Sequence, residues 1–150
     1  LERYNRRISG PIIDRIDLWV TVGNVDYKKL SDEVVRSEKT DAIKARVKAA
    51  RALQEKRFKN ISSPASARGS SRQRINTNSD MNAKDLAIFA PLAPSVKQLL
   101  NDSAEKLALS ARAYHRVIKI ARTIADLENS ENVEVNHILE ALQYRPKVNS

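Results

Sequence analysis

The chain has 150 residues, of which 41% are hydrophobic and 30% are charged, a composition typical of one globular domain with its own core. It carries a net charge of +9 and no cysteine, which excludes a disulfide framework and a thiolate metal site within it and fits a reducing compartment. No apolar run approaches the roughly 20 residues needed to cross a bilayer, so we expect a cytoplasmic protein with no membrane partner.

The first predicted element is a strand over residues 16–22. Its apolar residues alternate with other residue types, which is the period-2 pattern of a strand with one buried face. These residues are Ile16, Leu18, Val20 and Val22. Every later periodic stretch predicts helix, so the strand has no predicted partner, and an unpaired strand leaves its backbone groups unsatisfied. Since Leu1 is not an initiator methionine either, we expect the C-terminal piece of a larger protein.

A basic segment, residues 44–74, holds the net charge. It contains ten lysines and arginines against one acidic residue, Glu55, and so accounts for a charge of +9. From Thr40 or Asp41 to about Lys59 the sequence predicts a long helix, because this stretch is rich in alanine, lysine and arginine and carries a thin apolar stripe.

The stretch after this helix, about residues 60–80, is small and polar and predicts a mobile loop. The basic segment could contact the phosphates of nucleic acid independently of base sequence. The candidate contacts in the long helix are Lys44, Lys48, Arg51, Lys56 and Arg57. The alternative is a solvated helix face followed by a soluble loop, and the absence of interleaved aromatic residues for base stacking slightly favours it.

Four shorter helices are predicted in the second half of the chain. Asn82 and Asp85 match a capping box variant at the start of a short helix that reaches Phe89. Pro94 is placed as the first-turn proline of the next helix, which runs through Leu107.

The last two helices have the strongest apolar periodicity. Ser110 can cap the first of them, in which apolar residues repeat at helical spacing as far as Leu127. Val135 leads into the second, which continues through Leu142. The predicted fold class is therefore mainly α, a bundle of about four helices with the long basic helix packed at its side and a strand remnant at the N-terminus.

Two arginines are the main candidates for a functional site. Arg15 immediately precedes the predicted strand, and Arg112 lies in the first turn of the helix capped by Ser110, so the backbone fixes the direction of each guanidinium and can aim it at a phosphate. The alternative for Arg15 is a surface ion pair with Asp14 or Asp17. For Arg112 the alternative is an exposed helix residue, but a cation beside the positive end of the helix dipole is unfavourable unless an anion lies nearby.

Arg116, one turn after Arg112, is a weaker nucleotide candidate, and an interhelical contact is its alternative role. His115 and His137 have no partners at metal-ligand spacing, so we predict a surface or capping role for each and no metal site.

Three ordered blocks resemble one family. Residues 3–18, RYNRRISGPIIDRIDL, resemble the RY-x-x-RISGP-x-x-DRIDL segment of magnesium-chelatase-like AAA+ ATPases of the YifB/ComM type. Residues 109–116, LSARAYHR, and 121–127, ARTIADL, followed by residues 138–145, resemble the C-terminal helical lid of that family. The resemblance covers almost the whole chain and is weakest over about residues 59–80.

The resemblance implies that residues 1–25 end an AAA+ core and that residues 26–150 form the lid. Arg15 then occupies the position of the arginine finger, which reaches the γ-phosphate of the neighbouring subunit, and Arg112 occupies the position of the sensor 2 arginine. ATP and Mg²⁺ would be bound mainly by the core, because this chain has no G-x-x-x-x-G-K-[ST] phosphate loop and no acidic Mg²⁺ motif. We therefore expect no ATP hydrolysis by this chain alone.

The function implied is that of a homo-oligomeric ring, expected to be a hexamer, acting as a DNA motor or helicase linked to competence and recombination. One alternative is a non-enzymatic basic helical module that binds DNA. Another is a chelatase-type motor that acts on a protein or tetrapyrrole partner.

Overall fold

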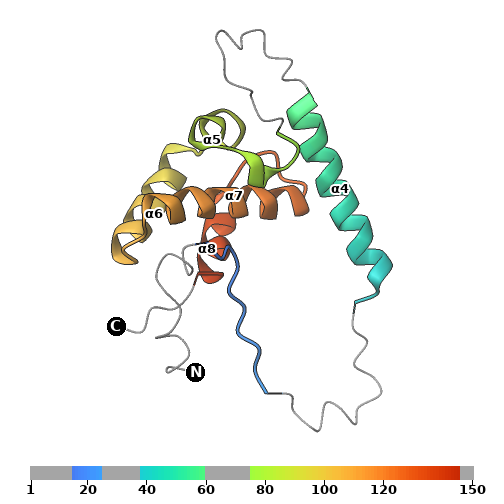
Figure 1. Ribbon diagram of the computed structural model, residues 1–150, viewed down its shortest axis with the longest axis horizontal. Coiled ribbons are helices and arrows are strands. Elements are labelled where there is room, and N and C mark those ends of the chain that lie inside the picture. Colours follow the sequence, from blue (N-terminus) through green and yellow to red (C-terminus); the bar gives the residue numbers. More distant parts are fainter. Residues whose placement is uncertain (1–14, 25–37, 60–74, 146–150) are drawn as a thin grey trace.

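The computed structural model describes residues 15–24, 38–59 and 75–145, and these contain helices and no strand (Figure 1). The predictions for residues 1–14, 25–37, 60–74 and 146–150, including most of the predicted loop, concern residues outside those described. The elements in chain order are α4 (Thr40–Lys59), a 3₁₀ helix η1 (Asn78–Asp80), α5 (Ala83–Phe89), α6 (Pro94–Lys106), α7 (Ala111–Leu127) and α8 (Val135–Gln143). The mainly helical fold is confirmed.

The helix starts follow the local chemistry that the sequence predicts. The Asn82 side chain accepts hydrogen bonds from the backbone N–H groups of Lys84 and Asp85, at 2.8 and 3.1 Å, and the Asp85 carboxylate accepts one from the Asn82 N–H at 2.9 Å. Pro94 occupies the first turn of α6. Ser110 caps α7 by accepting a hydrogen bond from the Ala113 N–H at 3.2 Å.

Helices α6 and α7 end in left-handed residues. Ala108 has a φ of 47° and Asn129 a φ of 57°. Each is followed by a residue whose N–H bonds back to a carbonyl five positions earlier, which closes the last turn of the helix. Asparagine tolerates this conformation, whereas alanine is strained in it.

Helix α7 is the centre of the bundle and contacts α4, η1, α5 and α8 (Figure 1). The buried faces of α7 and α8 carry small residues, Ala121 and Ala125 on α7 and Ala141 on α8, all at 0% exposure. Small side chains let the two helix backbones approach closely, and larger neighbours such as Leu100 and Ile138 fill the remaining space. The bundle therefore has a single contiguous core.

Helix α4 packs at the side of the bundle with its C-terminal half only. Ala50, Gln54 and Phe58 are buried, and the Phe58 ring meets Phe89 edge to face with centroids 5.5 Å apart. Residues 40–49 are all exposed, and in Figure 1 this half of the helix projects away from α7 and α8.

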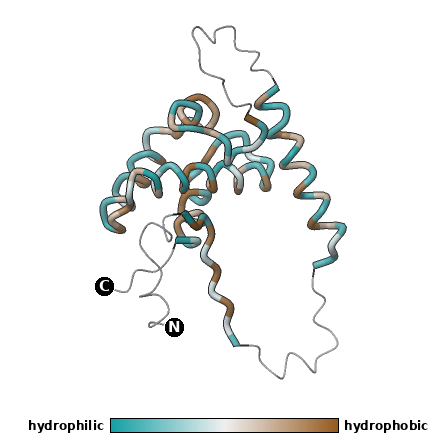
Figure 2. Tube along the Cα trace, viewed as in Figure 1, coloured by the Kyte–Doolittle hydropathy of each residue, from teal (hydrophilic) through white to brown (hydrophobic). Residues whose placement is uncertain are grey.

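The strand predicted over residues 16–22 is not formed. Residues 16–24 run extended, with one backbone hydrogen bond to the bundle, from the Trp19 N–H to the Tyr144 carbonyl at 2.8 Å. Leu18, Val20 and Val22 are exposed, and Figure 2 shows hydrophobic colouring along parts of this segment. The alternating pattern is present, but no second strand within the described residues pairs with it.

The end of the predicted loop differs from the expectation. Asn78 begins the short 3₁₀ helix and is only 2% exposed, packed between α4 and α7. The physical reason is that its amide meets buried polar partners on both helices.

None of the helices in the described ranges is long and apolar enough to cross a membrane.

Candidate functional site

A groove with a volume of about 730 Å³ runs along one side of α7. Its floor is apolar, and its α7 rim is polar and basic. The apolar floor includes Met81, Leu86, Ile120, Ile124 and Leu127. The α7 rim consists of Arg112, His115, Arg116, Lys119 and Thr123, and residues Asp17, Leu18, Glu140 and Tyr144 contribute from the extended segment and α8.

Three cations line the groove at regular spacing. Arg112, Arg116 and Lys119 are four and three residues apart, so they share one face of α7. Arg112 is exposed, in the first turn of the helix, and forms no hydrogen bond or ion pair within the described ranges. No group of the described residues therefore neutralises the charge of Arg112. The residue also lies at the end of the helix where the dipole favours an anion.

Arg116 and Lys119 are partly satisfied by neighbouring elements. The Arg116 Nε lies 3.0 Å from the Asp17 carboxylate, while one terminal nitrogen of its guanidinium is buried without a hydrogen-bond partner in the described part of the chain. The Lys119 ammonium donates to the Ser79 carbonyl at 2.8 Å. Burial lowers the pKa of Lys119, against the opposing charge of Asp17. Among the described residues, the ion pair of Arg116 is with the extended segment.

Arg15 lies at the start of the extended segment and is exposed. Its alternative partner Asp17 pairs with Arg116 instead, and Asp14 lies outside the described residues. Asp17 and Leu18 line the groove, so the segment that bears Arg15 reaches the groove that Arg112 also lines. Arg15 itself does not line it.

The basic residues of α4 do not act as one set. Lys44, Lys48 and Arg51 are exposed and share one face by their spacing, whereas Lys56 is exposed on another. Arg57 points inward, where its guanidinium contacts the Asp126 carboxylate through both terminal nitrogens, one of them at 2.9 Å. The charge of Arg57 is therefore compensated inside the protein.

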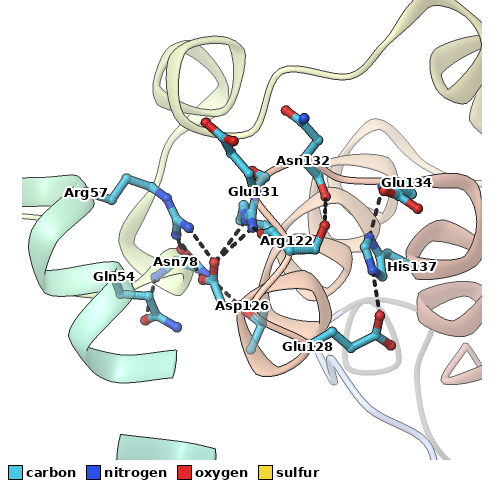
Figure 3. A network of polar contacts seen from close by, with 12 residues as sticks. Gln54, Arg57, Asn78, Arg122, Asp126, Glu128, Glu131, Asn132, Glu134 and His137 are labelled. Atoms are coloured by element: carbon cyan, nitrogen blue, oxygen red, sulfur yellow. Dashed lines mark hydrogen bonds and ion pairs between the residues drawn. The ribbon is translucent and has the colours of Figure 1, made fainter. Parts of the chain in front are cut away.

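Asp126 is the centre of a buried polar network that joins α4, η1 and α7 (Figure 3). Besides Arg57, it accepts hydrogen bonds from the Asn78 amide at 2.8 Å and from the Arg122 Nε at 3.1 Å. Arg122 also donates to the backbone carbonyls of Ser130 and Glu131, at 2.6 and 2.8 Å. Asp126 can be buried as a charged group because these hydrogen-bond and ion-pair partners are buried with it.

The network determines the ionisation of Asp126. Burial alone would raise the pKa of Asp126, but hydrogen bonds from Arg57 and Asn78 and the charges of both arginines outweigh it, and the pKa lies below its ordinary value. Sequence reasoning missed this network. The local signal was the i, i+4 spacing of Arg122 and Asp126 on the apolar face of α7.

His137 has a capping role. Its Nδ1 accepts a hydrogen bond from the Glu134 N–H at 2.9 Å, and its Nε2 lies 2.9 Å from the Glu128 carboxylate. In the parts of the chain that the structure describes, no three His, Cys, Asp or Glu side chains are arranged to hold a metal ion.

Comparison with known proteins gives concordant matches. The sequence model of the family described as magnesium chelatase, subunit ChlI C-terminal, matches residues 37–145. The chain is 34% identical to the competence protein ComM of Haemophilus influenzae over 97% of its own length and 26% of the relative's. It is 33% identical to the uncharacterized protein YifB of Escherichia coli, over 95% and 25%. The chain thus spans about a quarter of the length of the curated relatives it matches.

Proposed function

We propose a function from one premise: the chain belongs to the magnesium chelatase ChlI C-terminal family. It is the lid and arginine-finger region of a ring-forming AAA+ ATPase. Helices α5 to α8 close over ATP that is held mainly by the core of the whole protein, and the chain supplies cations to the phosphates. Closure of the lid then repositions the adjoining subunit.

The observation that carries this proposal is the row of cations beside the groove on α7. Arg112 has no protein partner within the described ranges, and Arg116 keeps one buried terminal nitrogen unsatisfied. Unsatisfied guanidinium nitrogens beside a helix N-terminus fit phosphate oxygens. In this role Arg112 contacts the phosphates as the sensor 2 arginine, and Arg116 contributes from one turn further along the helix.

Arg15 acts on a different nucleotide. It is exposed, and no side chain in the described ranges holds it, so it is free to reach the γ-phosphate bound by the next subunit. A guanidinium supplied to a phosphoryl-transfer site accelerates the reaction by roughly 10³- to 10⁵-fold. Hydrolysis would then depend on ring assembly.

Mg²⁺ would neutralise charge on the phosphates in the assembled site. The described residues offer no cluster of metal ligands, so we assign no ligand to the metal in this chain. The chain's own contribution is the placement of Arg112, Arg116 and Arg15.

The motor acts on DNA in this proposal. Lys44, Lys48, Arg51 and Lys56 present exposed positive charge on α4, which can bind phosphates independently of base sequence. Arg57 is left out because it pairs with Asp126. The description of one relative as a competence protein agrees with a role in DNA uptake or recombination.

The test is ATP hydrolysis by the whole protein with single substitutions. Arg15→Ala should lower kcat at least a hundredfold with nucleotide binding intact, and Arg112→Ala should weaken both binding and turnover. Arg46→Ala is the matched control, since Arg46 is an exposed arginine that forms an ion pair with Glu38. Mixing Arg15→Ala subunits with subunits disabled in the phosphate loop should restore partial turnover. Absence of rescue at every mixing ratio would contradict a finger that acts in trans.

The exposed basic face of α4 also supports a second function, a DNA-binding module without ATPase activity. In that case the chain alone would retain DNA in a salt-dependent way, and Lys48→Ala with Arg51→Ala would abolish retention. Unchanged ATPase in Arg15→Ala and Arg112→Ala proteins would then favour this second function.

A further inference from the structure

The N-terminal half of α4 has an apolar stripe that nothing in the described part of the chain covers. Ile43 and Val47 are 43% and 47% exposed, and they continue the line of Ala50, Gln54 and Phe58, which are buried against the bundle. Lys44, Lys48 and Arg51 run beside this stripe. The uncovered half of the helix is therefore an apolar surface with a basic edge, which we call the α4 face (Ile43, Lys44, Val47, Lys48 and Arg51).

A second uncovered surface has the opposite charge. On α8, Val135 and Leu139 are one turn apart and 40% and 46% exposed. Residues 123–144 contain no lysine or arginine, and Glu131 and Glu134 lie exposed at the start of this helix. We call this the α8 face (Glu131, Glu134, Val135 and Leu139).

The two faces of one molecule cannot meet each other. The C-terminal half of α4 is fixed to α7 through Arg57 and Asp126 and through the packing of Phe58. Its N-terminal half therefore projects in a fixed direction, clear of α8 (Figure 1). Among the described residues, α8 of the same chain therefore cannot cover the α4 face.

We propose that the α4 face of one subunit docks on the α8 face of the next subunit in the ring. The apolar residues of the two faces would pack together, and the basic edge would lie against the glutamates. Pairing of two α4 faces is disfavoured, since it would set Lys44, Lys48 and Arg51 against the same residues. An α4-to-α8 contact is heterologous. When two subunits are joined in this way, each still has one unused face, so the same contact can repeat until the ring closes.

This inference rests on the proposed ring, and it names a contact separate from the nucleotide site. Docking would withdraw Lys44, Lys48 and Arg51 from DNA, so in the ring DNA would be bound through other exposed cations of α4, such as Lys56. A surface of about three helical turns is small for a stable interface. It therefore adds to the contact made through nucleotide and does not replace it. For this reason the association should be measured with ATP present.

The experiment uses charge reversal in the whole protein, with association followed by sedimentation in the presence of ATP. Lys44→Glu with Lys48→Glu, and separately Glu131→Lys with Leu139→Lys, should each weaken association by about tenfold or more. An equimolar mixture of the two variants should recover association, because each supplies the face that complements the other. The matched controls on exposed sites elsewhere are Lys84→Glu with Lys97→Glu, and Glu105→Lys with Leu107→Lys.

The outcomes separate this inference from the function it rests on. Unchanged association in both variants, or a loss that mixing does not recover, would overturn the docking of α4 on α8 and leave the ATPase proposal intact. Loss of DNA retention with unchanged association would assign the α4 face to nucleic acid and overturn the docking. A wild-type protein that stays monomeric with ATP would overturn both the ring and this interface.

Discussion

The two ends of α7 use arginine in opposite ways. Near the N-terminal end, Arg112 and Arg116 border a groove, and among the described residues the one carboxylate paired with either of them is Asp17, on a separate segment. Near the C-terminal end, Arg122 is 2% exposed, and its guanidinium is shared between Asp126 and two carbonyls. The two ends differ in the number of hydrogen-bond acceptors that the protein offers to the guanidinium groups. An arginine whose acceptors come from the protein has a structural role, and an arginine without them is available to a ligand.

Desolvation explains why the two ends differ in this way. A charge can be buried only if its partners come with it, and removal of one partner leaves the other buried and uncompensated. Arg112 is exposed and keeps its hydration, so the fold does not depend on its charge. The C-terminal end should therefore respond to mutation with a loss of stability, and the N-terminal end with a loss of function.

The strongest test of this contrast is Asp126→Ala. The substitution leaves the guanidinium groups of Arg57 and Arg122 without their common acceptor, so we expect the free energy of unfolding to fall by about 3 to 5 kcal/mol. Chemical denaturation followed by circular dichroism would measure it. Asp102→Ala is the control, because Asp102 is exposed on α6 and accepts a hydrogen bond from Gln98. A loss below about 1 kcal/mol for Asp126→Ala would break the comparison.

A second test uses two adjacent residues of α4. Arg57→Ala removes hydrogen bonds to the buried Asp126 carboxylate, so unfolding should require about 1.5 to 3 kcal/mol less free energy. Lys56→Ala removes an exposed cation and should change stability by no more than about 0.5 kcal/mol. Equal effects in the two variants would show that Arg57 is not held by the network.

Acid should weaken the C-terminal end selectively. The pKa of Asp126 is lower in the folded chain than its ordinary value, so the unfolded chain binds a proton first as pH falls. The contribution of Asp126 is complete above the unfolded pKa of about 3.9 and is lost as pH falls through the folded pKa. Denaturation midpoints measured between neutral pH and about pH 3 should decline in the wild type. They should decline less steeply in Asp126→Asn, and parallel curves would contradict this assignment.

The sequence predicted the helices well because their starts depend on local chemistry. Asn82, Pro94 and Ser110 each act on backbone groups within the next few residues, so one stretch of sequence contains all the necessary information. The same locality explains the failure at residues 16–22, because a strand requires a partner that the described chain does not contain.

The candidate site was only partly predictable for a related reason. Arg112 could be chosen as a candidate because its position in the helix alone makes its charge unusual. Arg57 looked like the other basic residues of α4, because its partner Asp126 is 69 residues away along the chain. Long-range pairing leaves no trace in local spacing, so the inward arginine could not be separated from the exposed ones by sequence.

The smallest expected effect on stability is that of Arg112→Ala, and its sign sharpens the comparison. Arg112 lies in the first turn of α7, where a positive charge opposes the helix dipole, and it has no acidic partner in the described ranges. Its removal should leave the free energy of unfolding unchanged or raise it by about 0.3 to 1 kcal/mol. Thermal denaturation of the protein without nucleotide would measure the change, with Lys97→Ala on α6 as the exposed control. A loss of more than about 1 kcal/mol would mean that Arg112 has a structural partner, and the two ends of α7 would then differ only in degree.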